Sequence, residues 1–160
     1  MRHAADRDAS ALLGIANDPA TRAASRTTQA IGPDEHLAWL QSVLRRGQAP
    51  FWVAESEGLV VGQVRFADLG EAWELGYGLD PIARGLGWSA PLVTEGIRRV
   101  REHRDAPIVA VVGDGNEISH HMLQGLGFRS DPEGRQSRAL GARVGAGFSA
   151  YLLDPGRPAL

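Results

Sequence analysis

The sequence has 160 residues, the length of one ordinary domain, so we expect residues 1–160 to form a single domain. With 17 basic and 19 acidic residues the formal net charge is −2, which argues against both nucleic acid and an anionic membrane surface as partners. No apolar run approaches the roughly 18 residues of a membrane span, and residues 1–6 lack the apolar core of a signal peptide, so we expect a cytoplasmic protein.

Two residue types are missing, and each absence excludes a class of chemistry. Without cysteine there is no disulfide, no thiolate nucleophile and no thiolate metal ligand. Every basic residue is an arginine, so no lysine can form a Schiff base with a carbonyl substrate. His120 and His121 are adjacent, and neighbouring residues of a helix point in different directions, so they make a poor metal pair. We expect no metal site.

The first third of the chain predicts two helices. Residues 11–16 form an apolar stretch that Asp6 and Asp8 can cap and that ends at residues 17–19. Residues 19–31 predict a polar connection, and loops of this length within compact domains are often functional. A second helix opens at residues 32–35 and carries an apolar stripe of Leu37, Leu40, Val43 and Leu44.

The middle of the chain changes to a period of two. Residues 51–55 and 59–66 predict an antiparallel hairpin around a tight turn. Residues 72–79 predict a third strand, in which large residues alternate with Glu74, Gly76 and Gly78. One face of this strand is therefore packed, and the other is nearly bare.

The last part predicts a crossover and a closing strand. Residues 88–103 predict a helix with Leu92, Val93, Ile97 and Val100 buried, and residues 107–112 form the apolar run of a central parallel strand. Asn116 can cap a helix that buries Ile118, Met122 and Leu126. Phe128 begins a short strand or turn, residues 131–145 predict a loop, and residues 148–153 predict a last strand.

These elements predict an α/β (α+β) fold with a mixed sheet, antiparallel early and parallel at the crossover. Their order is strand, helix, helix, three strands, helix, strand, helix, and one or two strands, with about four helices in all. The four tryptophans, Trp39, Trp52, Trp73 and Trp88, are expected in the core.

The segment that most clearly predicts a binding site is an Arg/Gly turn between the strand with the bare face and a helix N-terminus. Backbone N–H groups in the first turn of a helix have no partner within it, and glycines let an anion approach without a Cβ clash. Residues 84–89, Arg-Gly-Leu-Gly-Trp-Ser, therefore predict a phosphate site.

In its wider context this turn resembles a known family. Residues 79–89, Leu-Asp-Pro-Ile-Ala-Arg-Gly-Leu-Gly-Trp-Ser, resemble the CoA-pyrophosphate loop of GNAT acetyltransferases. Residues 116–119 and 122–128 are similar to that family's last helix and its closing Leu-Gly-Phe. The resemblance covers about residues 1–128. It implies a GNAT-type, mostly antiparallel sheet, acetyl-CoA as the acyl donor, and direct transfer to an amine without a covalent enzyme intermediate.

The resemblance also implies roles for individual residues. Glu74 would remove the proton from the amine. Leu79 would pair with the pantetheine arm through its backbone, and its N–H could stabilise the oxyanion. The residues implied to bind the cosubstrate are Leu79, Arg84, Gly85, Leu86, Gly87, Trp88, Ser89 and Asn116. Asn116 has the alternative of being only a helix cap. Leu123 stands where many members carry a tyrosine as general acid, which leaves the acid step open.

The acceptor is the most open part of the prediction. Residues 17–19, 35–39 and 61–66 resemble the branch that acetylates amino groups of nucleotide-linked amino sugars, which implies a small-molecule primary amine. The alternatives are a protein N-terminus or peptide amine, and a CoA-binding module without turnover. Arginines in the loop could meet an anionic acceptor or simply be solvated, namely Arg129, Arg135, Arg138 and Arg143. Whether exposed strand edges pair two subunits as a homodimer is also open.

Overall fold

The structure is a computed structural model that describes residues 1–45 and 50–156. The chain forms two compact units, Met1–Arg65 with Tyr77–Leu92, and Phe66–Gly76 with Val93–Leu160. We call them the first and the second unit. The expectation of a single domain stays a prediction.

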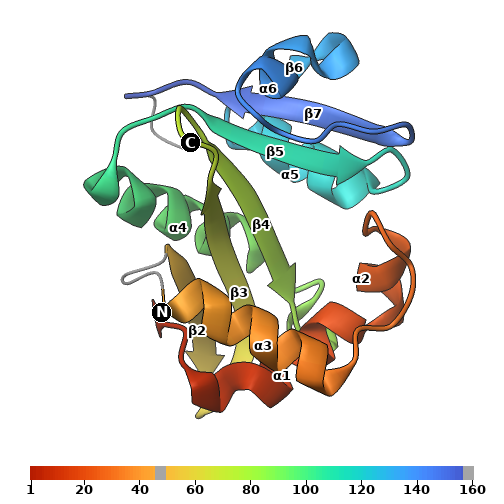
Figure 1. The fold of residues 1–160 in the computed structure, drawn as a ribbon, viewed down its shortest axis with the longest axis vertical. Coiled ribbons are helices and arrows are strands. Elements are labelled where there is room, and N and C mark those ends of the chain that lie inside the picture. The colour runs from red at the N-terminus through yellow and green to blue at the C-terminus, as the bar shows by residue number, and fades with distance from the viewer. Residues whose placement is uncertain (46–49, 157–160) are drawn as a thin grey trace. The chain divides into compact units, whose positions relative to one another are not determined.

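Within the described residues the strands form one sheet in the order β1-β2-β3-β4-β5-β7-β6 (Figure 1). Its strands are β1 (Arg2–His3), β2 (Phe51–Ser56), β3 (Leu59–Asp68), β4 (Trp73–Leu79), β5 (Ile108–Gly113), β6 (Arg129–Asp131) and β7 (Phe148–Leu153). The β4–β5 pair is parallel, whereas β1–β2, β2–β3, β5–β7 and β6–β7 are antiparallel. The mixed sheet predicted from the sequence is confirmed, including the parallel strand at the crossover.

Six α-helices occur in the described part of the chain, rather than about four. They are α1 (Ala9–Asn17), α2 (Pro19–Ala23), α3 (Pro33–Leu44), α4 (Ser89–His103), α5 (Glu117–Gly125) and α6 (Arg135–Ala139), with 3₁₀ turns η1 (Asp6–Asp8), η2 (Pro81–Ala83) and η3 (Pro132–Gly134). The additional helices, α2 and α6, are five residues each and lie in the two segments predicted as connections. A helix of one turn carries too little apolar periodicity to be recognised.

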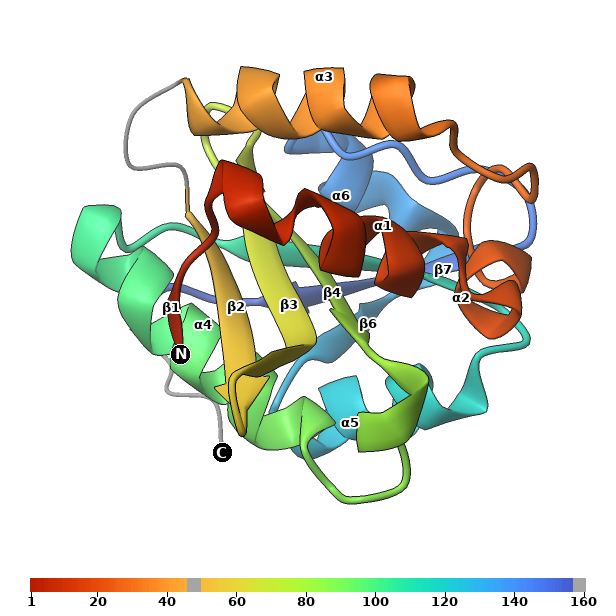
Figure 2. The ribbon, with the colours of Figure 1, turned by 90° about the horizontal axis from the view of Figure 1, so that it is seen from below.

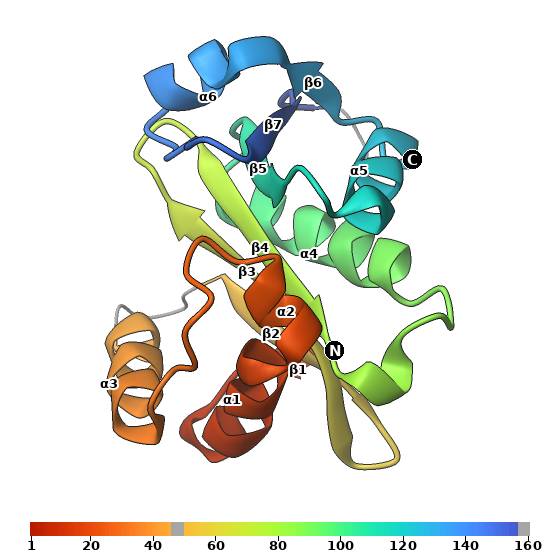
Figure 3. The same cartoon turned by 90° about the vertical axis from the view of Figure 1, so that its right-hand side faces the viewer.

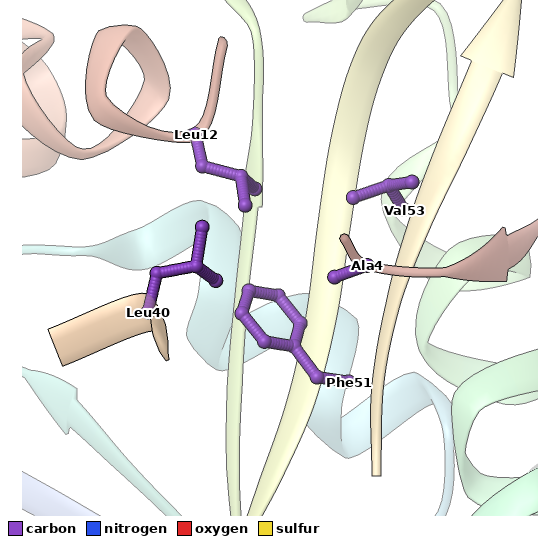
Figure 4. Packing of buried hydrophobic residues seen from close by; sticks show 5 residues of the cluster. All are labelled: Ala4, Leu12, Leu40, Phe51 and Val53. Atoms are coloured by element: carbon purple, nitrogen blue, oxygen red, sulfur yellow. The ribbon is translucent and has the colours of Figure 1, made fainter. Parts of the chain in front are cut away.

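The core of the first unit lies between its helices and its hairpin. Ala4, Leu12, Leu40, Phe51 and Val53 form one buried cluster (Figure 4). Figure 2 shows α1 and α3 side by side over one face of β2 and β3. Phe51 and Val53 of β2 belong to this cluster, and Trp52 between them is buried as well, so both faces at the start of β2 are covered.

In the second unit, β5 lies between β4 and β7, and β6 follows β7 (Figure 1). A buried cluster of Ala72, Val109, Ala142 and Leu152 joins β5 and β7 to the segment after α6. The entirely apolar run of β5 is explained by this position, because a strand with neighbours on both edges and covered faces exposes no side for polar residues.

Several predicted burial faces differ from the observed ones. In α3 the buried residues are His36 and Leu40, while Leu37 is 38% exposed. In α5 the structure buries Ser119 and Leu123, whereas Ile118 is 80% exposed. The remaining apolar positions agree with the prediction, since Leu40 and Leu126 are buried and Val43 and Leu44 pack against the core. His36 is buried near the start of α3, where burial lowers its pKa.

Two of the four tryptophans are in the core. Trp52 and Trp73 are buried as expected, but the expectation is wrong for Trp39 and Trp88, which are each 37% exposed. Trp88 stands in the turn before α4, where no second layer covers it.

The N-terminus of the first unit is held by a partly buried ion-pair network. Asp8 is 3% exposed, and both of its carboxylate oxygens accept hydrogen bonds from the Arg2 guanidinium at 2.7 and 2.8 Å. The N–H of Ala5 donates to Asp8 Oδ2 at 2.8 Å, and Arg2 also reaches Glu55 on β2. The Arg2 hydrogen bond lowers the pKa of Asp8 below its ordinary value of 3.8.

This network predicts a pH dependence of stability. Because the pKa of Asp8 is lower in the folded than in the unfolded state, its contribution is complete above about pH 4 and is lost as the pH falls through the folded value. Asp8→Asn should reduce the free energy of unfolding by about 2 kcal/mol at pH 7 and flatten the acid limb. Urea unfolding between pH 3 and 7 measures both effects. Asp6→Asn, at an exposed neighbour, is the control, and equal acid limbs in wild type and Asp8→Asn would contradict the assignment.

Candidate active site

The turn between β4 and α4 is an open, glycine-shaped loop in the first unit. Asp80 starts it by accepting the N–H of Ile82 at 3.0 Å, and η2 follows. Gly85 and Gly87 have φ values of +73° and +76°, and no atom lies within 4 Å of the position that a Cβ would take at either residue. Left-handed backbone of this kind favours glycine strongly. Both glycines are thus required by the turn, which presents its backbone to open space.

The amides of this turn are available to a ligand. Within the described part of the chain, the backbone N–H groups of Gly85, Leu86 and Gly87 make no hydrogen bond. The first hydrogen bond of α4 runs from Leu92 N to Trp88 O at 3.1 Å, so the earlier amides of the helix have no partner inside it. Pro91 has no N–H, which leaves Ser89 and Ala90 to carry the positive end of the helix. Groups of this kind can bind an anion, and phosphate binding by residues 84–89 stays a prediction.

Leu79, at the end of β4, is packed tightly against β3. A Cβ on Gly62 would meet Leu79 Cδ2 at 2.7 Å and Leu92 Cδ2 at 3.2 Å, so a larger residue at position 62 would force the Leu79 side chain to move. Asp80 N donates to Val61 O at 3.0 Å and continues the contact beyond the strand end. The backbone on which the turn depends is therefore fixed where β4 ends.

Arg84 is not a solvated arginine. Its Nη2 lies 2.7 Å from Asp18 Oδ1, 3.2 Å from Thr21 Oγ1 and 3.3 Å from Leu79 O. Asp18 is the N-cap of α2 and also accepts the N–H groups of Ala20 and Thr21. The hydrogen bond from Arg84 lowers the pKa of Asp18, so the pair is ionised at neutral pH. Sequence analysis did not find this partner, because the two residues lie 66 positions apart and share no motif.

Glu74 lies in the second unit, near the start of β4. The parallel register places Trp73 opposite Ile108, Glu74 opposite Val109 and Leu75 opposite Ala110. Trp73 and Leu75 are buried, whereas Glu74 is only partly exposed, in agreement with the predicted alternation. The structure thus provides a carboxylate on the less buried face of a central strand, and its catalytic role stays a prediction.

Asn116 is a helix cap in the structure. Its Oδ1 accepts the N–H of Ser119 at 3.2 Å at the start of α5, and its own N–H donates to Gly113 O. Capping uses only the carbonyl oxygen of the side-chain amide, and the two N–H donors of Nδ2 are not needed for it. The capping by Asn116 is confirmed, and its contact to pantetheine stays a prediction.

The four loop arginines, for which an anionic acceptor and simple solvation were both left open, have partners within the protein. Arg129 contacts Asp154 and Gln136, and Arg135 pairs with Glu133. Arg138 donates to the backbone carbonyl of Glu133, and Arg143 also has an interaction within the protein. These contacts favour a structural use of the arginines over an anionic acceptor site.

Comparison with known proteins identifies the family. The model of the family described as "Acetyltransferase (GNAT) domain" matches residues 1–129, which is most of the chain. The chain belongs to the GNAT acetyltransferase family. No match was found among curated proteins.

Solved structures agree with this GNAT assignment. Ribosomal-protein-alanine N-acetyltransferase from Brucella melitensis is 26% identical, with a TM-score of 0.76 over 94% of this chain and 95% of that one. The yncA protein from Salmonella typhimurium, solved with its cofactor acetyl-CoA, is 23% identical, with a TM-score of 0.76 over 96% and 91%. A phosphinothricin acetyltransferase from Sinorhizobium meliloti in complex with acetyl-CoA is 19% identical, with a TM-score of 0.77 over 98% and 88%.

The family assignment makes this GNAT chain an acetyl-CoA-dependent N-acetyltransferase. Acetyl-CoA is the acyl-donor cosubstrate, and enzymes of the family need no metal. Among residues 1–45 and 50–156 there is no group of three or more histidine and acidic side chains that could hold a metal ion. No helix in these ranges is both long and apolar enough to cross a membrane.

A second contact that could not be predicted from the sequence joins His120 to Tyr151. His120 Nε2 lies 3.1 Å from Gly113 O and 3.3 Å from Asp114 O, and His120 Nδ1 lies 2.7 Å from the Tyr151 hydroxyl. Carbonyl oxygens only accept, so in the neutral ring Nε2 carries the proton and Nδ1 accepts the hydroxyl of Tyr151. His120 is therefore a connecting residue between α5, β5 and β7 rather than a solvated surface histidine.

Alanine substitution should have opposite effects at a left-handed glycine of this turn and at a glycine inside a helix. Gly87→Ala forces a Cβ onto a residue with φ of +76° and should lower the free energy of unfolding by about 1 kcal/mol. Gly14→Ala, inside α1 with no atom within 4 Å of the new Cβ, should raise it by about 0.5–1 kcal/mol. Urea unfolding of both variants measures this difference, and an unchanged stability of Gly87→Ala would show that the turn is not constrained as described.

Proposed function

We propose that the protein transfers an acetyl group from acetyl-CoA directly to the primary amine of a small molecule, with the turn at residues 84–89 as the pyrophosphate site. The observation that supports this assignment is the open turn, in which Gly85 and Gly87 are left-handed and the amides up to α4 have space in front of them. Oriented N–H groups and the positive helix end stabilise a diphosphate without a lysine, and the chain has none. Leu86, Trp88 and Ser89 bind through the backbone of the same turn.

Glu74 acts as the general base in this proposal. A primary amine is protonated near neutral pH, so a carboxylate must accept its proton, directly or through water, before the nitrogen can attack. The nitrogen then forms a bond to the thioester carbonyl carbon, and the carbonyl oxygen becomes an oxyanion. The C–S bond breaks as the oxygen re-forms its double bond, the CoA thiolate leaves, and the second proton that the nitrogen must lose to become an amide passes to water. The Leu79 N–H donates to that oxyanion, and Asn116 donates from Nδ2 to the pantetheine arm.

The leaving group needs little assistance at this step. A thiol has a pKa near 8.5, so the CoA thiolate is a stable leaving group near neutral pH. Leu123, at the position of the tyrosine found in many GNAT enzymes, is fully buried in α5. It neither donates a proton nor lies at the surface, and the proposed reaction proceeds without a side-chain acid at this position.

An amino sugar is the first acceptor to test, because residues 17–19, 35–39 and 61–66 resemble the corresponding branch of the family. Internal contacts weaken the support that residues 17–19 give to an amino-sugar acceptor, since Asn17 binds the backbone of Ile31 and Asp18 caps α2. The loop arginines give no extra support for a nucleotide-linked sugar, because they pair with groups of the protein.

A protein N-terminus is the second candidate acceptor. The observation that favours it is the similarity to the Brucella melitensis enzyme, which is described as acting on alanine of a ribosomal protein. Thiol release measured with a panel of nucleotide-linked amino sugars, free amino sugars and short peptides beginning with alanine distinguishes the two. Turnover of peptides alone would overturn the small-molecule proposal, and CoA binding without any turnover would favour the binding-module alternative.

The role of Glu74 predicts a loss of turnover on removal of its charge. Glu74→Gln should lower kcat by about 10²- to 10⁴-fold while the KM for acetyl-CoA changes little, because the amide cannot accept the proton. Steady-state thiol release with the best acceptor measures both parameters. Glu71→Gln, an exposed neighbour just before β4, is the matched control and should keep wild-type kcat. Full activity of Glu74→Gln would exclude this residue as the base.

Asn116 can be tested for the two roles separately. Asn116→Asp keeps an oxygen that caps α5 but removes both N–H donors, so its thermal stability should match wild type. If Nδ2 binds the pantetheine arm, the KM for acetyl-CoA should rise about fivefold or more, the effect of one lost hydrogen bond. An unchanged KM, with Asn116→Ala lowering only the thermal stability, would limit Asn116 to capping.

A further inference from the structure

Arg84 joins two separate stretches of the first unit through one nitrogen atom. Asp18 Oδ1, Thr21 Oγ1 and Leu79 O all lie within 3.3 Å of Nη2. Asp18 and Thr21 belong to the start of α2, and Leu79 ends β4, which leads directly into the turn. The guanidinium is therefore a bridge between α2 and the turn at residues 84–89.

The other edge of this guanidinium is not used by the protein. A guanidinium carries five N–H donors in a rigid plane, and those on Nε and Nη1 make no hydrogen bond within the described residues. The Arg84 side chain is 36% exposed, against 13% for Asp18. One edge is thus anchored inside the unit, and the opposite edge is available to a phosphate, which guanidinium binds well.

The position of Asp18 requires an explanation, because a carboxylate beside an anion site repels the anion. Capping of α2 alone does not require its charge, since asparagine caps equally well. Orienting Arg84 does require the charge, because the salt bridge at 2.7 Å fixes the plane of the guanidinium.

The segment after Asp18 is ordered as a continuation of α2. Arg22 donates to Ala16 O at 2.6 Å and to Ser25 Oγ at 3.0 Å, and Ser25 Oγ donates to Thr21 O. Asn17 exchanges two hydrogen bonds of 2.8 Å with the backbone of Ile31. Figure 3 shows α2 directly after α1, with the connection to α3 beyond it. Residues 19–31 are therefore tied to the end of α1 at Ile31, and to α2 through Arg22, which also donates to the carbonyls of Thr27 and Gln29.

We propose that Asp18 is a positioning residue that acts through Arg84. It holds the Nη2 edge of the guanidinium so that Nε and Nη1 face the diphosphate. Through this contact, binding of the cosubstrate is coupled to the order of residues 19–31. The inference rests on the proposed role of residues 84–89 as the pyrophosphate site. A bound diphosphate fixes the outer edge of Arg84, and the same rigid plane then restrains Asp18 and α2. The coupling is reciprocal, so order in residues 19–31 in turn strengthens binding of the diphosphate.

The first test is a double-mutant cycle on CoA affinity by calorimetry. Asp18→Asn keeps the α2 cap and should raise the Kd for CoA about two- to fivefold, as expected for a partly exposed pair, and Arg84→Ala should raise it about tenfold. In the Arg84→Ala background, Asp18→Asn should not raise the Kd further and should lower it slightly, because only the repulsion between the carboxylate and the anion is then removed. Asp34→Asn, an exposed acid in the first turn of α3, changes the net charge equally and should leave the Kd unchanged. Equal effects of Asp18→Asn in both backgrounds would overturn the proposal.

The second test reports the coupling directly. CoA should slow hydrogen exchange at the amides of Arg22, Ser25 and Ile31, each of which is hydrogen-bonded, in wild type but not in Asp18→Asn or Arg84→Ala. Thermal stability of free Asp18→Asn should fall only slightly, because asparagine keeps the cap and only a partly exposed pair is lost, which separates this loss of protection from unfolding of α2. Failure of wild type to bind CoA would overturn the proposed function together with the inference. CoA binding with equal protection in all three proteins would overturn the inference alone.

Discussion

A salt bridge at the beginning of α2 is the interaction on which the candidate site depends. The first unit is assembled from residues 1–65 and 77–92, so the end of β4 and its turn must be attached to a part of the chain that is distant in sequence. The Arg84 guanidinium does this at 2.7 Å from Asp18, and the packing of Leu79 against Gly62 completes the attachment. A flexible glycine turn binds an anion well only if its two ends are fixed, because ordering it on binding would cost affinity.

The sequence predicted the strands better than the short helices, for a physical reason. The alternation in residues 62–66 reflects one face of β3 that is more deeply buried than the other, and the apolar runs of residues 51–53 and 107–112 reflect strand segments that are buried on both faces. The five residues of α2 contain no complete apolar stripe, and residues 17–19 were interpreted as a helix end. Asp18-Pro19 ends α1 and also caps α2, with proline at the first position, and composition alone does not separate these two uses.

The candidate site was predictable where its chemistry is local. Left-handed turns need glycine, so Gly85 and Gly87 before a helix predicted a turn, which the structure contains, and its binding of an anion stays a prediction. Contacts between distant segments could not be found in this way. The pairs Arg84–Asp18 and His120–Tyr151 unite side chains that are each compatible with a solvated surface, and only the tertiary structure brings them to hydrogen-bond distance.

The His120–Tyr151 contact bears on the missing general acid. Tyr151 is 5% exposed, and burial raises the pKa of its phenol. Its hydroxyl donates inward to His120 Nδ1, whose ring is held by the carbonyls of Gly113 and Asp114. A phenol that is buried and already committed as a donor is poorly placed to protonate a leaving group, so it does not replace the tyrosine lost at Leu123. With a thiol pKa near 8.5, departure of the thiolate costs little near neutral pH. Deprotonation of the amine, the role proposed for Glu74, is therefore the proton transfer for which this site most needs a side chain.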